Sequence, residues 1–242
     1  MQALRPNEDV TTFLDYLFSP DDSGYVYAPS KVIETESFNQ DFFRWPEDKY
    51  KLVEWVLKTT PTAEVYIAPA LFSHPSAQKD SFKQTNVLWT EFDGNMPQTF
   101  GDIPAPTLRI QSSDESHQHC YWKLEEPLSD WREVEALNRT LAYSLNADAS
   151  AWDCNQVLRP PGTRNHKRDT FVSMAFNGGG ATLSAGLFTP TYPTTVVTEF
   201  DTDTIPDVTD VIYKYEFPVA VSALLRTKEL PVGERSTALM RL

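Results

Sequence analysis

The spacing of apolar residues and of helix-start signals predicts helices in three stretches of the chain. Apolar positions recur every three or four residues from Asn7 to Phe18 and over residues 130–145, as on one face of an amphipathic helix. A further helix is expected to run to about Thr59, because W-P-E-D at residues 45–48 places a proline and two acids where a helix start favours them. Ser129 is the expected N-cap of the 130–145 helix.

Strand-like runs lie between and after these helices. Residues 63–69, 86–93, 107–111 and 118–124 have the short apolar or alternating pattern that is typical of strands. The polar stretch S-S-D-E-S-H separates the last two runs, so we expect those strands to form a hairpin. Another pair of strands is expected near residues 154–176. The periodicity alone therefore indicates a mixed α and β fold.

The C-terminal part of the chain has a different character. Residues 197–210 are acidic and contain a proline, which indicates a surface segment leading into a last helix near 208–226. The final G-E-R-S-T-A-L-M-R-L is typical of the opening of another helix that stops at Leu242. We therefore expect the chain to be a fragment of a longer protein.

Composition narrows the classes of protein. With 242 residues and 40% apolar side chains, the chain can build a sizeable core. The formal net charge of -13 argues against non-specific attraction to nucleic acid, so any such contact must be local. No apolar run is long enough to cross a membrane and the N-terminus lacks a signal peptide, which predicts a cytoplasmic protein without a membrane partner. Cys120 and Cys154 are too few for a disulfide framework and are expected to be reduced.

One strand-like run ends in two acids. In N-V-L-W-T-E-F-D-G at residues 86–94, Glu91 and Asp93 are two positions apart, so both side chains project from the same face of the strand. Such a pair can hold divalent cations. It can equally be the solvated end of a strand, and the pattern alone leaves both interpretations open.

Two further stretches add chemistry to this pair. His119 lies on the strand predicted to return beside residues 107–111. Residues 148–167, D-A-S-A-W-D-C-N-Q-V-L-R-P-P-G-T-R-N-H-K, join acids to the densest positive cluster of the chain, which Arg168 extends. Carboxylates from separate strands, a histidine and several cations are what metal-assisted phosphoryl transfer requires.

These motifs, in this order, resemble the archaeo-eukaryotic primase superfamily, and specifically the primase-polymerase domains of phage and plasmid replication proteins. E-F-D matches the first motif, H-C-Y-W the second, and the stretch from residue 148 to 167 the third. The resemblance implies an α/β fold with an RRM-like antiparallel sheet and a smaller N-terminal α/β part. We accordingly divide the chain into residues 1–85, a catalytic part over 86–207, and a helical segment over 208–242 that begins a truncated further domain.

The family pattern also implies roles for individual residues. Glu91, Asp93 and Asp148 would hold two Mg²⁺ or Mn²⁺ ions. The nucleotide would be bound by His119, Arg159, Asn165 and Lys167. Secondary candidates are Ser113, His117, Asp153 and Arg164.

Some positions depart from the family pattern. His117 stands where a small residue is common, Gln156 where an arginine is common, and Glu91 where aspartate is more usual. Asp153 competes with Asp148 for the role of third carboxylate. These departures put the metal spacing and one nucleotide contact in question.

The implied activity is DNA-directed priming and polymerisation, with nucleotidyl transfer from dNTPs or NTPs onto a primer or an initiating nucleotide. The expected partners are a single-stranded DNA template, which would cross near Trp152 and Arg164, and a helicase or helical C-terminal region of the same full-length protein. The preference for ribo- or deoxyribonucleotides is not encoded in any residue that we can identify.

Two other functions remain open from the residues. H-Q-H at 117–119 superficially fits the metal-binding histidines of a nicking replication initiator of the HUH class, which would also need a nucleophile such as Tyr143. A non-catalytic single-strand-binding module is the other alternative, and it would show no dependence on Glu91 or Asp93.

Overall fold

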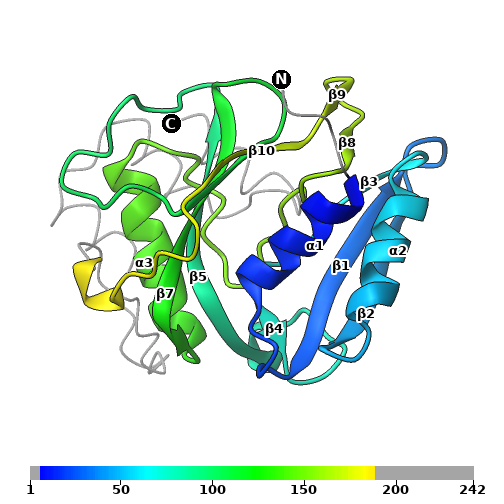
Figure 1. Ribbon diagram of the computed structural model, residues 1–242, viewed down its shortest axis with the longest axis horizontal. Coiled ribbons are helices and arrows are strands. Elements are labelled where there is room, and N and C mark those ends of the chain that lie inside the picture. The colour runs from blue at the N-terminus through cyan, green and yellow to red at the C-terminus, as the bar shows by residue number, and fades with distance from the viewer. Residues whose placement is uncertain (1–5, 189–242) are drawn as a thin grey trace, which may run out of the picture. The chain divides into compact units, whose positions relative to one another are not determined.

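The computed structural model describes residues 6–188, which form an eight-stranded antiparallel sheet with three α-helices (Figure 1). The helices are α1 (Pro6–Leu17), α2 (Lys49–Thr59) and α3 (Trp131–Ser144). The strands of the large sheet are β1 (Gly24–Val32), β2 (Phe38–Trp45), β3 (Ala63–Val65), β4 (Leu71–Phe72), β5 (Phe82–Asp93), β6 (Leu108–Gln111), β7 (His117–Leu128) and β10 (Ser173–Asn177). The mixed α/β class and the antiparallel sheet are confirmed.

The strand order explains how the N-terminal part joins the sheet. It runs β10-β6-β7-β5-β4-β1-β2, with β3 paired to β1. A separate small hairpin consists of β8 (Arg164–Asn165) and β9 (Thr170–Phe171), and two short 3₁₀ turns, η1 (Lys79–Ser81) and η2 (Ala185–Leu187), complete the described elements. Because β5 pairs with β4, the sheet is continuous across the predicted division at residue 85. That division stays a prediction.

Alternation along β5 creates two cores on opposite faces of the sheet. Trp89 packs with the buried faces of α1 and α2 in one core, whereas Leu88 and Phe92 pack in the other with Leu137 of α3. Figure 1 shows α1 and α2 together on one side of β5 and α3 on the other. Glu91 and Asp93, at the end of β5, therefore project from the same face of the sheet as Trp89, which is the face that α1 covers nearer the start of the strand.

The helices and strands predicted within residues 6–188 are confirmed with shifted ends. The α3 helix is capped by Asp130 rather than by Ser129, because the Asp130 carboxylate accepts a hydrogen bond from the Arg132 backbone N–H at 2.9 Å. The α2 helix begins at Lys49, after the W-P-E-D stretch, and the Asp48 carboxylate accepts from the Arg44 backbone N–H at 3.1 Å instead of capping the helix.

The Pro-Pro-Gly-Thr turn packs against the start of α1. Gly162 has φ +81°, and a Cβ there would lie 2.7 Å from the Pro6 carbonyl oxygen. Only glycine accommodates both this backbone conformation and this approach. The turn is thereby held where its basic continuation, residues 164–168, can reach the sheet.

The predicted helices near 208–226 and at the C-terminus lie outside the described residues. Within residues 6–188, no helix has both the length and the apolar character needed to cross a membrane.

Candidate active site

The pairing of β5 with β7 brings the two predicted acids against the two histidines. Glu91 is opposite His119 and Asp93 is opposite His117 in the register. The His119 Nε2 atom lies 3.5 Å from Glu91 Oε1, and the His117 Nε2 atom lies 3.0 Å from Asp93 Oδ1. The predicted hairpin is the pairing of β6 with β7, which carries the histidines; the pairing of β5 with β7, which brings the acids against them, was not predicted from the sequence.

His117 is held between two carboxylates. Its Nδ1 atom lies 2.8 Å from Asp114 Oδ1 in the β6–β7 turn, and its Nε2 atom faces Asp93. The Arg168 guanidinium approaches the same ring at 3.5 Å. Hydrogen bonds from Ser116 and His117 hold the pKa of the Asp114 carboxyl well below its usual value. The imidazole therefore joins the turn, the basic stretch and the exposed Asp93.

Glu91 is favoured in its ionised form. Burial raises the pKa of its carboxyl, but the hydrogen bond and charge of His119, together with the charges of Arg159 and His117, outweigh burial and leave the pKa below its usual value. His119 itself is only 1% exposed, and its Nδ1 atom has no hydrogen-bond partner. In this structure His119 is a partner of Glu91, and its predicted contact with nucleotide phosphates stays a prediction.

Asp148 lies beside Glu91 through the backbone. The Asp148 N–H donates to the Glu91 carbonyl at 2.8 Å, and the Asp148 carboxylate accepts from Ser150 N–H and Oγ. The rival candidate Asp153 belongs to another cluster, because it pairs with Lys79 at 3.1 Å. The backbone of Asp148 therefore contacts Glu91, whereas Asp153 pairs with Lys79, and the choice of Asp148 as third carboxylate stays a prediction.

The donor set is suited to a hard divalent cation. Glu91 and Asp93 present carboxylate oxygens on one face, and oxygen is the ligand that Mg²⁺ and Mn²⁺ prefer. Among residues 6–188, however, no three His, Cys, Asp or Glu side chains converge in an arrangement that could hold a metal ion. The acid pair fits the ion chemically, and the third carboxylate is linked to the pair only by its backbone.

Two of the four predicted nucleotide-binding residues line a cavity of about 320 Å³ at the ends of β1 and β3. Arg159 and Lys167 both contribute to its wall, together with Glu64 and Tyr66. Arg159 Nε donates to Glu64 Oε2 at 2.8 Å, and its Nη2 donates to the Tyr66 hydroxyl at 3.2 Å. The charge of Arg159 lowers the pKa of the Glu91 carboxyl, so this side of the cavity is electrostatically coupled to the acid pair.

Three other predicted residues are engaged within the fold. The Asn165 amide donates to the Ser112 carbonyl at 2.9 Å and is buried, so it links the basic turn to the β6–β7 turn. Arg164 pairs with Asp169 and remains partly exposed. Ser113 lies in the β6–β7 turn, where its carbonyl accepts from Gln111.

Sequence reasoning missed Glu64 and Tyr66, which lie in the predicted strand 63–69. Alternation places their side chains on one face, which was the only signal available. It missed Asp114 and the contact of Arg168 with His117 as well. These residues come from segments distant in sequence, and their proximity depends on the order of strands in the sheet.

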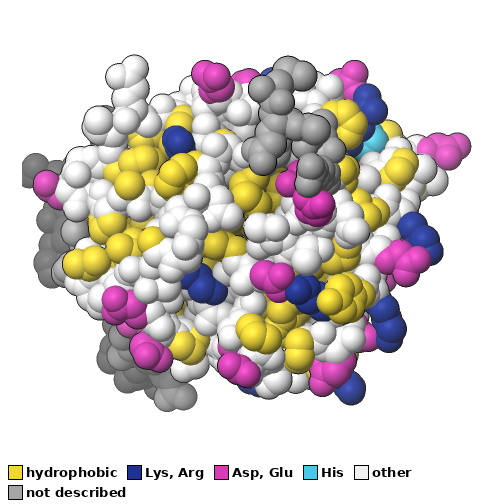
Figure 2. All heavy atoms as spheres, viewed as in Figure 1, with side chains coloured by type: hydrophobic (Ala, Val, Ile, Leu, Met, Phe, Trp, Pro, Cys, Tyr) yellow, Lys and Arg dark blue, Asp and Glu magenta, His cyan; other side chains and the backbone are white. Residues whose placement is uncertain are grey.

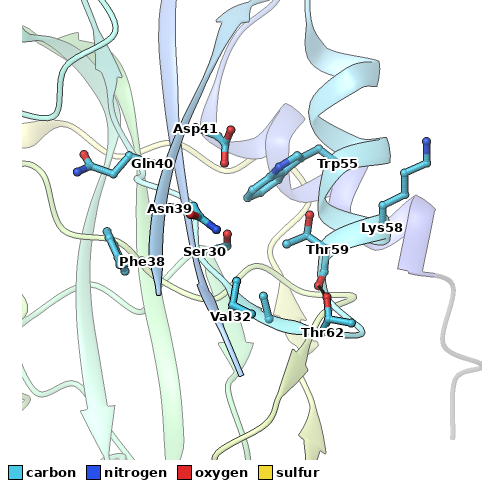
Figure 3. A pocket seen from close by; sticks show the side chains of 11 residues that line it. Ser30, Val32, Phe38, Asn39, Gln40, Asp41, Trp55, Lys58, Thr59 and Thr62 are labelled. Carbon is cyan, nitrogen blue, oxygen red and sulfur yellow. Dashed lines mark hydrogen bonds between the residues drawn. The ribbon is translucent and has the colours of Figure 1, made fainter. Parts of the chain in front are cut away.

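A larger cavity, of about 710 Å³, lies elsewhere. Figure 3 shows Trp55 and Thr59 of α2 facing Ser30, Asn39 and Asp41 of β1 and β2 across it, while the Lys58 amine points away. None of the predicted site residues lines it. On the face drawn in Figure 2, Lys and Arg side chains are scattered among Asp and Glu and form no broad basic patch.

Within residues 6–188, the geometry does not assemble a nicking endonuclease site from His117, His119 and Tyr143. Tyr143 belongs to α3, which packs through Leu137 and Leu141 on the face of the sheet that carries Leu88. The side chains at 117 and 119 project from the opposite face, by alternation from Cys120.

Comparisons with known proteins give the fold. No protein-family model and no curated protein matches the sequence. The structure is similar to primase RepB′ (14% identity, TM-score 0.56, covering 75% of this chain and 59% of that one). It is also similar to the archaeo-eukaryotic primase domain of the primase-polymerase of cyanophage S-2L (14% identity, TM-score 0.58, 75% and 95% covered).

A further solved structure is the catalytic domain of primase RepB′ in complex with initiator DNA, which is 15% identical with a TM-score of 0.56 over 75% of this chain and 89% of that one. The chain spans less than two thirds of the RepB′ structure first named, so the activity of the whole protein is a separate matter. The described part of the chain has the fold of an archaeo-eukaryotic primase-type catalytic domain.

Proposed function

We propose that this protein is a DNA-directed primase-polymerase that transfers nucleotides from dNTPs or NTPs to a primer end or an initiating nucleotide. The observation that carries the proposal is the pair of acids, Glu91 and Asp93, at the end of β5 on a primase-type fold, with Glu91 under the charge of Arg159, which lines a cavity with Lys167. Carboxylates for cations next to cations for phosphates are the arrangement that phosphoryl transfer needs.

Glu91, Asp93 and Asp148 are the residues that would hold two Mg²⁺ or Mn²⁺ ions. When bound, such ions activate an attacking hydroxyl and neutralise charge on the triphosphate and the leaving pyrophosphate. Glu91 is prepared for this role, because His119 keeps it ionised despite its burial. Asp93 is largely exposed at the strand end and accessible to a ligand.

The residues of the chain contribute mainly by positioning charge. Arg159 and Lys167 would bind the triphosphate, and the Arg159 guanidinium is preorganised by two hydrogen bonds. The peptide N–H of Asp148 donates to the Glu91 carbonyl, which keeps the backbones of the two residues in contact and supports Asp148 as the proposed third carboxylate. No covalent enzyme intermediate is required, since the incoming hydroxyl displaces pyrophosphate directly.

The template would cross near the basic hairpin β8–β9. Arg164 lies 5.8 Å from the ring centroid of Phe171, which is exposed, and Arg168 lies beside the acid pair through His117. Single strands bind where local positive charge accompanies stacking surfaces. The other template candidate, Trp152, is stacked under Arg139 at 3.9 Å, which favours a packing role. A helicase or helical C-terminal region is the proposed further partner.

Primer extension tests this function. A labelled primer on a single-stranded template is incubated with dNTPs and Mg²⁺ or Mn²⁺, and Asp93→Ala is compared with Asp102→Ala, an exposed aspartate in the loop after β5. We expect wild type and Asp102→Ala to extend the primer, and Asp93→Ala to lose at least about 100-fold in rate. A lane without primer tests priming.

Each outcome has a defined meaning. Extension that persists in Asp93→Ala would show that the acid pair is not the catalytic site. Metal-independent single-strand binding without extension in the wild type would favour the non-catalytic module. Products in the primer-free lane establish priming in addition to polymerisation.

A further inference from the structure

Arg159 is fixed by one edge of its guanidinium. Its Nε and Nη2 atoms donate to Glu64 and Tyr66 at 2.8 and 3.2 Å, and its charged carbon lies 5.0 Å from the centroid of the Tyr66 ring. Arginine has a second pair of donors, which includes Nη1, and this pair suits bidentate binding of phosphate. The two contacts therefore occupy the edge of the guanidinium that carries Nε, and the edge that includes Nη1 remains for a ligand.

Glu64 is fully engaged. Its Oε2 accepts from Arg159 Nε, and its Oε1 accepts from the backbone N–H of Lys167 at 3.0 Å. The Glu64 and Arg159 side chains are 7% and 16% exposed. One buried carboxylate thus fixes both predicted phosphate-binding residues, one through its side chain and the other through its backbone.

A negative charge in a phosphate pocket requires an explanation, since it opposes the ligand. Burying Glu64 costs desolvation energy, and a buried ion pair is seldom a net source of stability. An alternative benefit is geometry: the guanidinium can be held at a set angle between the cavity and the acid pair. Burial raises the pKa of the Tyr66 hydroxyl, the charge of Arg159 opposes this, and the charges of Glu64 and Glu91 add to it, while Arg159 also lowers the pKa of Glu91, so the cavity and the acid pair are electrostatically coupled.

We propose that Glu64 is a positioning residue for nucleotide binding, which holds Arg159 so that its free edge faces the triphosphate, with Tyr66 as the second support. The proposal rests on the function proposed above. It assigns to β3, which lies outside the three sequence motifs, a share in the nucleotide pocket. The ligand class is a nucleoside triphosphate, and the part recognised is its phosphate chain.

Nucleotide binding and steady-state extension of Glu64→Gln test this role. Glutamine keeps the volume but removes the charge that orients Arg159. We expect KM for dGTP, and the dissociation constant measured with dGTP and Ca²⁺, to rise roughly 10- to 100-fold, because small misplacements of positioning groups have effects of that size. The fall in kcat should be smaller. The matched control is Glu54→Gln, which removes a carboxylate paired with Lys58 at 2.6 Å on α2 and should leave both constants unchanged.

A double-mutant cycle separates positioning from simple loss of folding. If Glu64 acts through Arg159, then adding Glu64→Gln to Arg159→Gln should change the dGTP affinity by less than about twofold. Urea unfolding of each variant confirms that the measured protein is folded. The double variant no longer buries an unpaired arginine, so it remains informative if Glu64→Gln alone is unstable.

Two results would overturn the proposal: folded Glu64→Gln with wild-type affinity for dGTP, or an equal loss in the presence and absence of Arg159. Failure of the wild type to bind dGTP at all would instead contradict the proposed function. The two ideas can therefore fail separately.

Discussion

At the scale of single residues, the same side chain can satisfy a motif and serve the fold. Asn165 matches a family position near the nucleotide, yet its amide donates to the Ser112 carbonyl and its oxygen accepts from the Arg168 backbone N–H. It thereby fixes the basic turn against the β6–β7 turn. No rule of spacing distinguishes an asparagine that binds a ligand from one that binds its own backbone.

Asn165→Ala should consequently lower the stability of the protein. The substitution leaves the buried Ser112 carbonyl without its donor, which costs about 1–3 kcal/mol of the free energy of unfolding. Urea unfolding followed by tryptophan fluorescence measures this change. Asn39→Ala, at an exposed position on β2, is the control and should cost under about 0.5 kcal/mol. Equal effects in the two variants would contradict the linking role of Asn165.

At the scale of elements, the alternation of side chains along strands was the main basis for predicting the site. The pattern of β5 indicated that Glu91 and Asp93 share a face, and the polar turn before residue 117 indicated the β6–β7 hairpin that carries His119. The pairing of β5 with β7, which places His119 opposite Glu91, was not predicted. The β1–β2 hairpin was missed because β1 contains Pro29 and because β2 shows no regular alternation of apolar and polar residues and is partly exposed. The partners of Arg159 were missed for a related reason, since they depend on β3 pairing with β1.

The α3 helix shows how an element supports the site from the opposite face. Leu141 of α3 is fully buried against the face of β5 that carries Leu88. The chain continues from the end of α3 to Asp148. Leu141→Ala should destabilise the protein by about 2–5 kcal/mol through the cavity it leaves. Glu133→Ala, on the exposed side of the first turn, should cost under about 1 kcal/mol. Thermal unfolding of both variants checks the difference, and a small effect of Leu141→Ala would show that α3 is not packed there.

At the scale of the whole molecule, charge and burial act in different regions. The chain carries a formal net charge of -13, while its basic residues from 159 to 168 are gathered in one turn and hairpin. That concentration was visible in the sequence, and it indicated where phosphates could bind. Its relation to the acid pair could not be calculated from spacing, because it requires the Gly162 turn to pack on α1 and the hairpin to reach β7.

Buried groups that ionise at high pH make stability depend on alkaline pH. Burial raises the pKa of Cys120 from 9.0 to about 12, and burial raises the pKa of the Cys154 thiol and of the Tyr121 and Tyr16 hydroxyls as well. Because these groups are held neutral in the folded state, their contribution to stability is complete below their ordinary pKa values. It is lost as the pH rises toward the folded values.

The free energy of unfolding should therefore be constant near pH 7.5 and fall above about pH 9. At pH 10.5 the thiol of Cys120 alone accounts for up to about 2 kcal/mol of the fall. Urea unfolding at pH 7.5, 9 and 10.5 measures the dependence, and Cys120→Ala should show a shallower fall because it lacks one of the ionising groups. An identical fall in wild type and Cys120→Ala would mean that the thiol is not shielded from water. A free energy of unfolding that does not change with pH would mean that Tyr121 and Cys120 ionise as readily in the folded protein as in the unfolded chain. The burial of both side chains argues against this result.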